Sequence, residues 1–497
     1  MELKTEGYRL HNISPLFLFI EAIKKSVIPL LFGIVGTSGD KQDFIIIAIA
    51  VLASVITIIQ FWFYHYWLEE DRLVVKEGIL FKSLRQVPYE RIQNLNVEKN
   101  ILHRIFNVAT LQVESASGTK PEAVIRVISD QQVTHIQGVI KERAHTVIQD
   151  DTDPKVSSTD DADKSGASPL YQMSNKDVTT FGFISHRALV PIGIVASVLS
   201  QNDFYRNKFF NVVQKFVGEL HVERWAITEW LLYGLGFALF TLITIWLSSI
   251  LLAFLKLYQF KLSRQGNNLL AQMGLLTKIT ANIPIKRIQL LKIKHSPLHR
   301  YFKKVSVKME TAGGVTEKSG ITMSWIAPLI SRPHAQNLVT SIQPEVDWSA
   351  IKWQRLEERA WKRVFKRVSL FIFLPMAPLV YFYHAWGLLL LTLIPLAFIY
   401  AKAYVKKAGY AMNDEIIAYR HGVIFHTISV VKVAKIQNIS YLQTPFDRRN
   451  GMARITVDTA GSNPINQDIN IHYLDIDKVH DLMSKLSTQV SLSKFVW

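Results

Sequence analysis

The chain has no cysteine among its 497 residues, and this absence excludes several kinds of chemistry. Without thiols there can be no disulfide, no cysteine nucleophile and no cysteine-ligated zinc or iron–sulfur site. No G-x-S-x-G, Walker A or G-x-G-x-x-G pattern stands out either. His295 and His299 have the spacing of a helical metal pair, but no third ligand is evident. We therefore expect a protein that is not an enzyme and holds no cofactor and no metal.

Acidic residues are also scarce, with 40 Asp and Glu against 57 Lys and Arg, for a net charge of +17. A strongly basic chain is typical of proteins that bind nucleic acid or an anionic membrane surface. Here the basic residues flank long apolar blocks, which favours the membrane. The sequence therefore predicts the lipid bilayer as a partner and no nucleic acid.

Charged side chains are missing from three long blocks. Residues 44–67 and 231–254 contain no Asp, Glu, Lys or Arg, and each is longer than the roughly 20 residues that a membrane span needs. The block 368–401 would form a helix about 51 Å long, too long for a hydrocarbon core of about 30 Å. Its centre reads His-Ala-Trp-Gly and suits a turn, so we expect two spans there, about 368–384 and 386–401.

Shorter apolar runs before the other two blocks complete a hairpin each. By analogy with the third block, 26–38 pairs with 44–67, and 188–202 pairs with 230–255, which gives six spans in three hairpins. The hairpin tips carry little net charge, whereas Lys and Arg gather at the opposite ends of the spans. Positively charged residues near span ends tend to stay in the cytoplasm. We therefore expect the tips outside and the rest of the chain in the cytoplasm.

A 28-residue stretch occurs three times without a gap, at 91–118, 287–314 and 435–462. Apolar and polar residues alternate within it, as at 109–113, which indicates half-buried strands. Ser129 with Gln132 resembles a capping box, and an apolar stripe at helical spacing follows, as at 133–140. The repeated unit is therefore a membrane hairpin followed by a small antiparallel β module with a C-terminal helix.

The motif opens with RIQ, has LHR at its centre and ends in a TAG-like close, and it resembles the pleckstrin-homology-like (PH-like) domains of type 2 from bacteria. The hairpin before each copy is similar to the multi-domain transmembrane members of that family. The resemblance implies two packed sheets capped by one helix, in a bacterial inner (plasma) membrane. The third copy departs from the motif, with Lys435 for Arg and Asp447 for His. If the motif binds something, the third module is where that role has changed.

The expected fold class is membrane α plus β, with three repeats of a two-helix transmembrane hairpin followed by a PH-like antiparallel β module with a C-terminal helix. The expected domains are an N-terminal helix and membrane hairpin 1 at 1–67, module 1 at 68–148, an acidic linker at 149–170, hairpin 2 with a long outer tip at 171–255, module 2 at 256–343, a basic helix and hairpin 3 at 344–401, and module 3 at 402–490.

Two polar residues recur in every copy of the motif, and they are the candidate site residues. A glutamine is interpreted as tying a strand to a neighbouring loop through its amide. An arginine can clamp a carboxylate or phosphate with two hydrogen bonds, from a ligand or another module, or it can pair with an acid of its own module. They are Gln93, Gln289 and Gln437, and Arg104, Arg300 and Arg448.

Residues 351–367 are a further basic segment, with seven basic and two acidic side chains. Trp353, Trp361 and Phe365 would share one stripe if the whole segment were helical. Such a segment is typical of an interfacial helix on anionic lipid, or of a basic helix packed on a module; both remain open.

The leading interpretation is a non-enzymatic membrane protein whose three cytoplasmic modules act as a platform for binding or assembly, since tethered modules gain avidity. The resemblance implies assembly with itself or with a related PH-like membrane protein, in envelope stress or resistance. The alternative is membrane transport or lipid handling. It is weakened because the spans lack the buried charges that mark an ion or substrate route.

Overall fold

The computed structural model describes residues 7–20 except 18, 59, 61–78, 82–115, 122–146, 169–185, 226–312, 325–460 and 469–492, together with a few isolated positions between 189 and 215.

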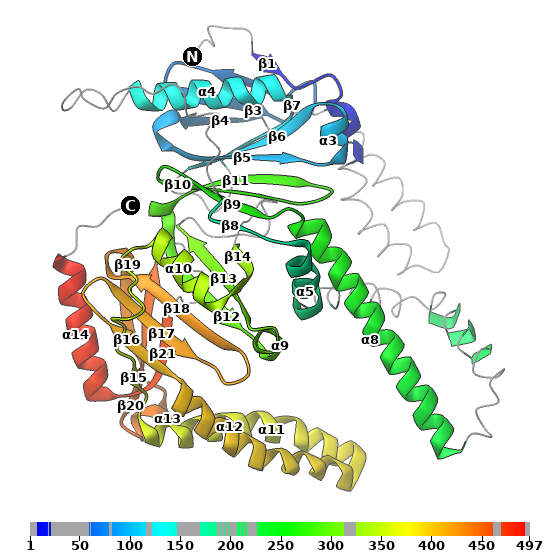
Figure 1. The fold of residues 1–497 in the computed structure, drawn as a ribbon, viewed down its shortest axis with the longest axis vertical. Coiled ribbons are helices and arrows are strands. Elements are labelled where there is room, and N and C mark those ends of the chain that lie inside the picture. Colours follow the sequence, from blue (N-terminus) through cyan, green and yellow to red (C-terminus); the bar gives the residue numbers. More distant parts are fainter. Residues whose placement is uncertain are drawn as a thin grey trace.

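Three β modules follow one another, each with four strands, a 3-10 turn, three more strands and a closing helix (Figure 1). Module 1 comprises β1 (Tyr8–Arg9), β2 (His65–Leu68), β3 (Arg72–Glu77), β4 (Ser83–Pro88), η1 (Tyr89–Arg91), β5 (Ile92–Lys99), α3 (Ile101–Ile105), β6 (Val108–Ser115), β7 (Ala123–Ser129) and α4 (Asp130–Thr146).

The other two modules repeat this order. Module 2 comprises β8 (Tyr171–Gln172), β9 (Lys261–Gln265), β10 (Asn268–Met273), β11 (Lys278–Pro284), η4 (Ile285–Arg287), β12 (Ile288–His295), α9 (Pro297–Tyr301), β13 (Lys304–Thr311), β14 (Trp325–Ser331) and α10 (Arg332–Ile342). Module 3 comprises β15 (Gln354–Arg355), β16 (Gly409–Met412), β17 (Ile416–His421), β18 (His426–Lys432), η8 (Val433–Lys435), β19 (Ile436–Leu442), α13 (Pro445–Arg448), β20 (Met452–Thr459), β21 (Ile469–Asp475) and α14 (Ile476–Leu492).

The predicted strand alternation and closing helices are confirmed. In β6 the side chains of Ala109, Leu111 and Val113 are fully buried, as expected for the core face of a strand. The predicted capping box before α4 is present, because the Ser129 hydroxyl accepts from the Gln132 amide and the Gln132 side chain accepts from the Ser129 amide. The stripe of α4 covers the core of module 1.

The sheets do not stop at the module boundaries. β5 of module 1 pairs antiparallel with β11 of module 2, and β12 of module 2 pairs antiparallel with β18 of module 3. Two sheets of seven strands result, in the orders β7-β6-β5-β11-β10-β9-β8 and β14-β13-β12-β18-β17-β16-β15. Figure 1 shows β5 beside β11 where the blue and green modules meet. Neighbouring modules are therefore joined by backbone hydrogen bonds, which the sequence did not predict.

Each module also begins earlier than expected, with a two-residue strand before the hairpin. β1 pairs with β2, β8 with β9, and β15 with β16, in the same register each time. The chain therefore leaves a sheet edge, passes through the hairpin segment, and returns to the neighbouring strand. Strands this short carry no periodic signal, so the sequence could not reveal them.

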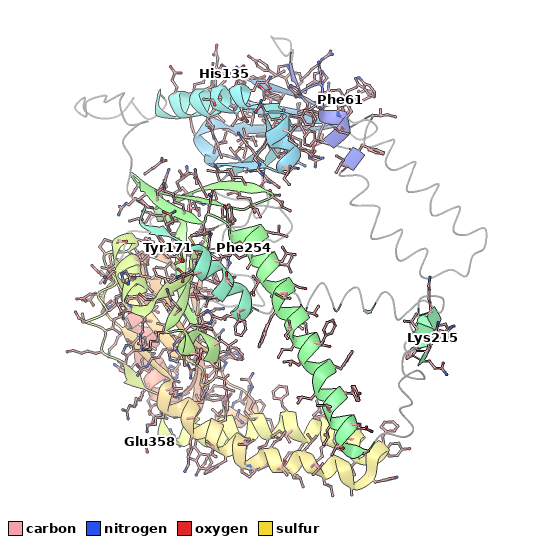
Figure 2. All side chains as sticks on the ribbon, turned by 45° about the vertical axis from the view of Figure 1, so that its right-hand side comes forward. Phe61, His135, Tyr171, Lys215, Phe254 and Glu358 are labelled. Atoms are coloured by element: carbon pink, nitrogen blue, oxygen red, sulfur yellow. The ribbon has the colours of Figure 1, made fainter. Side chains whose placement is uncertain are left out.

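Three helices among the described residues are long and apolar enough to cross a membrane: Leu231–Leu257, Glu358–Phe382 and Gly387–Lys407. They lie in α8 (Ile227–Leu257), in η6 (Glu358–Ala360) with α11 (Trp361–Tyr383), and in η7 (His384–Thr392) with α12 (Leu393–Lys407). The chain reverses at the predicted turn, where a Cβ added to Gly387 would lie 2.5 Å from the Val380 nitrogen. Figure 2 shows α8 and the α11–α12 pair extending beyond the β modules.

The remaining predicted spans fall outside the described residues, namely 26–38, nearly all of 188–202 and most of 44–67. The acidic linker also falls outside, apart from 169 and 170. The complete arrangement of three hairpins therefore stays a prediction.

Two predicted boundaries differ from the structure. The block 44–67 does not end in the membrane, because His65–Leu68 is strand β2 and Tyr66 is buried in the core of module 1. Tyr64 and Tyr66 of its aromatic end belong to the core of module 1, whereas Trp62 and Phe63 are exposed. The basic segment 351–367 is not one helix, because α11 begins at Trp361. Trp353 lies before β15, so it shares no helical stripe with Trp361.

The first helix of the second hairpin segment, α5 (Asn175–Ser185), packs closely against α8. A Cβ on Gly182 would lie 2.5 Å from the Ile250 Cα, and the rings of Phe183 and Trp246 are 4.2 Å apart. Gly182 therefore permits a helix contact too close for any side chain.

We expect Gly182→Ala to destabilise the protein by about 1–3 kcal/mol, because the two backbones must separate. Gly138→Ala in α4 is the matched control. Its Cβ would meet nothing within 4 Å, so the better helix propensity of alanine should leave stability unchanged or raised by about 1 kcal/mol. Thermal unfolding of the purified chain, followed by tryptophan fluorescence, measures both. Equal melting temperatures for the two variants would contradict the α5–α8 contact.

Candidate anion-binding site

A one-turn helix lies at the centre of the repeated motif and orients its recurring arginine. Ser296 caps α9 by accepting from the amide of His299, and Thr444 caps α13 by accepting from the amide of Asp447. Asn100 does the same for α3. The LHR centre of the motif is therefore a capped helical turn. The recurring arginine directly follows the residue whose amide donates to the cap side chain.

Two of the three arginines contact the following module. The Arg104 guanidinium donates to the Leu275 carbonyl at 3.1 Å, and the Arg300 guanidinium donates to the carbonyls of Val423 at 2.5 Å and Ile424 at 2.8 Å. Leu275 and Val423 are equivalent residues of the repeat. Arg448 is exposed, and its side chain has no hydrogen bond or ion pair within the described part of the chain.

The three glutamines share a backbone irregularity. The register of β5 with β6, β12 with β13 and β19 with β20 shifts at the glutamine each time, which marks a β-bulge. Gln289 is buried and its Oε1 has no hydrogen-bond partner in the described structure, whereas Gln437 is exposed. The side chain of Gln93 lies outside the described residues. The expected tie to a loop is not seen at Gln289 or Gln437.

The two histidines of the motif in module 2 have different partners. The His299 ring bonds the Ser306 hydroxyl at 2.8 Å and the Ser296 hydroxyl at 2.9 Å, and burial lowers its pKa to about 4. His295 instead contacts His426 of module 3, with 3.0 Å between the ring nitrogens. No group of three or more His, Asp or Glu side chains that could hold a metal occurs among the described residues.

A cavity of about 370 Å³ lies at the junction of modules 2 and 3. Strand pairing between β12 and β18 creates it, because this pairing sets His295 opposite His426. The tryptophan rings of Trp348 and Trp353 form part of its wall. Among the described residues, four cationic side chains from α9, α10, α12 and β17 also line it, and no carboxylate does: Arg300, Arg332, Lys407 and Arg420.

The positive charge of this cavity is not neutralised by any carboxylate in the described part of the chain. Among the described residues, none of its four cations forms a salt bridge. The Nε of Arg420 is buried without a hydrogen-bond partner there, and its guanidinium lies 4.6 Å from the centre of the Trp353 ring. Burial lowers the pKa of Arg420, with a further contribution from Arg332 and Arg355.

The pKa values of His295 and His426, which line the cavity, reflect its positive electrostatic potential. Burial, together with the neighbouring His295 and Arg300, lowers the pKa of His426 to about 4. The His295 pKa is also lowered, by burial and then by Arg300 and Arg332. The arrangement thus suits an anion with several hydrogen-bond acceptors, which arginine forks recognise well.

Sequence reasoning identified one member of this cavity, Arg300, and missed the others. They come from segments up to 131 residues apart, joined by the His295–His426 contact. The sequence feature that could have pointed to the cavity was the basic segment 351–367, because its Trp353 forms part of the cavity wall.

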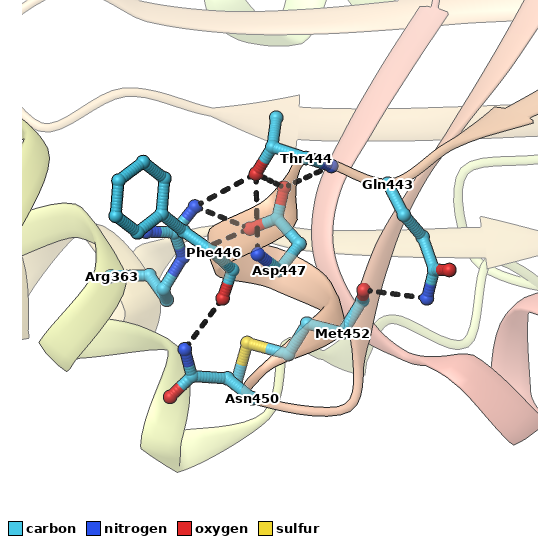
Figure 3. Close-up of polar contacts among 7 residues, drawn as sticks. All are labelled: Arg363, Gln443, Thr444, Phe446, Asp447, Asn450 and Met452. Carbon is cyan, nitrogen blue, oxygen red and sulfur yellow. Dashed lines mark hydrogen bonds and ion pairs between the residues drawn. The ribbon is translucent and has the colours of Figure 1, made fainter.

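Asp447, the departure from the motif in the third copy, anchors the third hairpin. Its carboxylate accepts from Arg363 near the start of α11, with Oδ1 2.6 Å from the guanidinium, and from the Thr444 hydroxyl at 2.6 Å (Figure 3). Burial alone would raise the Asp447 pKa, but the hydrogen bonds from Thr444 and Arg363 outweigh it and hold the pKa below its usual value. The carboxylate is therefore ionised at neutral pH.

Comparison with known proteins identifies related sequences. The family described as "Bacterial PH domain" matches residues 17–144, 217–346 and 369–490. The chain is 24% identical over 477 residues to "UPF0699 transmembrane protein YdbT" of Bacillus subtilis (strain 168), which covers 94% of this chain and 95% of the relative. No solved structure matches.

We expect Arg363→Gln to destabilise module 3 by about 1.5–3 kcal/mol, because it leaves the Asp447 carboxylate without its charged donor. Arg359→Gln is the control. It removes a more exposed pair with Asp475, which should cost less than about 1 kcal/mol. Because the Asp447 pKa is depressed, the loss should be complete at neutral pH and should fade below about pH 4 as the carboxyl protonates. Chemical unfolding at pH 7 and at pH 3.5 tests this; equal losses from the two variants at pH 7 would contradict it.

Proposed function

The chain belongs to the bacterial PH domain family and is a membrane protein, and we propose that its three modules form a non-enzymatic binding platform at the membrane surface. The cavity between modules 2 and 3 binds the phosphate of an anionic lipid headgroup. The modules face the cytoplasm of a bacterial cell. The family resemblance extends this to a role in envelope stress or resistance.

One observation carries this proposal: four cations and two tryptophan rings line one cavity, and none of the described residues that line it is a carboxylate. An uncompensated cluster of this kind is costly for a folded protein unless an anion is bound, because like charges repel. A phosphate offers acceptors to several guanidinium groups at once. The family model that matches this chain describes a PH domain and not an enzyme, which accords with a binding role.

The position of the cavity favours a lipid as the source of the phosphate. Lys407, one of its four cations, is the last residue of α12, and α12 belongs to one of the helices that can cross a membrane. One turn earlier, Lys402 lies 4.6 Å from the centre of the Phe398 ring, at the end of the helix where a headgroup layer would lie. We infer that the cavity opens at the level where lipid phosphates are concentrated.

The junction between modules makes the cavity a rigid site. Its walls belong to both modules, and the β12–β18 pairing fixes one wall relative to the other. A preformed site loses little entropy on binding. Transport is less well supported, because the blocks 231–254 and 368–401 contain no Asp, Glu, Lys or Arg.

We expect Lys407→Gln to weaken binding of an anionic lipid about fivefold, since one cation near a headgroup contributes about 1 kcal/mol. Lys406→Gln is the matched control, because it removes the same charge from the adjacent exposed residue, which does not line the cavity. The measurement is a titration of the full chain in neutral detergent with short-chain phosphatidylglycerol. Short-chain phosphatidylcholine and inorganic phosphate serve as the other ligands.

The three ligands separate the outcomes. Selective loss of phosphatidylglycerol binding in Lys407→Gln supports the proposal. Binding of inorganic phosphate with equal affinity would make the site one for soluble anions. Equal behaviour of the two lysine variants, or binding of phosphatidylcholine as tight as that of phosphatidylglycerol, would refute the lipid site.

The orientation has its own test, because the chain has no cysteine. Lys485 is exposed on α14 of module 3. We expect a membrane-impermeant maleimide to label the Lys485→Cys variant only after the cells are permeabilised. Labelling in intact cells would place module 3 outside and overturn the proposed orientation. Reaction of the purified variant with the same reagent is the control for thiol accessibility.

A further inference from the structure

Two strand edges of the repeat are open in this structure. At both internal junctions, the first strand of a module's second sheet pairs with the fourth strand of the following module: β5 with β11, and β12 with β18. The equivalent strands at the two ends of the series are β19 and β4. Each is an edge strand of its sheet, with no outer neighbour in the part of the chain that the structure describes. Figure 1 shows β4 in the uppermost module and β19 in the lowest.

The internal junctions share one register. Equivalent residues of modules 1 and 2 are 196 positions apart, and those of modules 2 and 3 are 148 apart, as the starts at 91, 287 and 435 show. Lys99 lies opposite Lys278 at the first junction, and their equivalents His295 and His426 lie opposite each other at the second. The pairing is therefore a property of the repeat.

Exposure differs where the partner strand is missing. Ile293 in β12 is 5% exposed, whereas its equivalent in β19, Tyr441, is 45% exposed. Ile428 in β18 is 8% exposed, whereas its equivalent in β4, Leu84, is 52% exposed. Large apolar side chains are thus left in water at both open edges, which a monomeric protein normally avoids.

The recurring arginine also differs between the internal junctions and the open edge of module 3. Arg104 and Arg300 each donate to a backbone carbonyl just after a glycine of the following module, Gly274 or Gly422. Both glycines have positive φ, and so does their equivalent in module 1, Gly78. Arg448 has no such acceptor among the described residues.

A charged pair spans the first internal junction. Arg287 of module 2 lies 3.8 Å from Glu114 of module 1 across the first junction. The equivalents at the open ends are Arg91, which is exposed, and Asp458. The Oδ1 of Asp458 is buried without a hydrogen-bond partner in the described structure, and burial raises the pKa of this carboxyl despite a hydrogen bond from Asn438.

We propose that a second copy of this chain places its β4 against β19, antiparallel and in the register of the internal junctions. This register sets Ser440 opposite Arg85, because their equivalents Lys292 and Ser429 are opposite at the second junction. Arg448 then lies near Gly78 of the copy, and Asp458 faces Arg91.

A second copy is the occupant that the chain itself specifies, since it carries both halves of the junction. The contact is heterologous, because the two partners use different surfaces, so it continues from copy to copy until a ring closes. Hairpins that share one membrane restrict successive copies to rotations about the membrane normal, which is compatible with ring closure. This inference does not depend on the lipid site.

The test is a disulfide between copies, in a chain that otherwise has no cysteine. Ser440→Cys and Arg85→Cys variants of the full chain, with different tags, are co-expressed, and their native membranes are mildly oxidised. Residues directly opposite in an antiparallel pair have Cα atoms about 4.5–5.5 Å apart, within the range of about 4.4–6.8 Å that disulfides span. We expect a cross-linked species of two chains that carries both tags.

The control moves one residue along the strand. Ser440→Cys with Gln86→Cys should give no such species, because a slip of one residue turns the side chain to the other face of the sheet. Adding Arg448→Ala to the Ser440→Cys variant should lower the yield of the first cross-link. Maleimide labelling of each single variant reports whether the edges are accessible.

Every other result overturns the proposal. Equal cross-linking of both pairs would show unspecific collision. A disulfide of Ser440→Cys with a different protein would show another occupant of β19. Accessible thiols that never cross-link would show that the edges stay open. Thiols that resist maleimide and do not cross-link would show that another segment of the chain covers the edges.

Discussion

The pairing of backbone groups across module boundaries is the constraint on which the rest of this structure depends. An edge strand presents amide and carbonyl groups that have to be paired or hydrated. The edges of β5 and β12 are filled by β11 and β18, so each module completes the sheet of its predecessor. The anion cavity follows from this, since the β12–β18 pairing brings its two walls together.

The same sheets govern how the membrane segments are attached. In each module a two-residue strand precedes the predicted hairpin segment and pairs with the strand that follows this segment, so both of its ends are held by one sheet. In module 3 the Arg363–Asp447 pair adds a side-chain contact between α11 and the motif helix. The position of a hairpin and the geometry of its module are therefore coupled through short, stiff connections.

The sequence predicted the parts of the fold that depend on side-chain burial. The alternation in β6, β13 and β20, the closing helices and the capping box of α4 all appear as expected, because a core face requires apolar residues at fixed spacing. The junctions could not be predicted this way, since backbone hydrogen bonds leave no residue pattern. Arg104 and Arg300 recur in the motif, yet their acceptors are main-chain carbonyls that any residue supplies. The cavity joins residues far apart in the chain, and the aromatic run ending at Trp67 continued from an apolar block directly into a core strand.

A repeat with one shared register at its junctions has a particular evolutionary freedom. Duplication of a whole unit adds both strands that form a junction, one equivalent to β4 and one equivalent to β19. The two ends of the longer chain are then the same as before, and no new interface has to arise. Loss of part of a unit is not neutral in this way, because it leaves an edge strand of one sheet without a partner strand. Gene duplication and deletion in this architecture should therefore proceed in whole units of hairpin and module, with boundaries before the short strand that opens each unit.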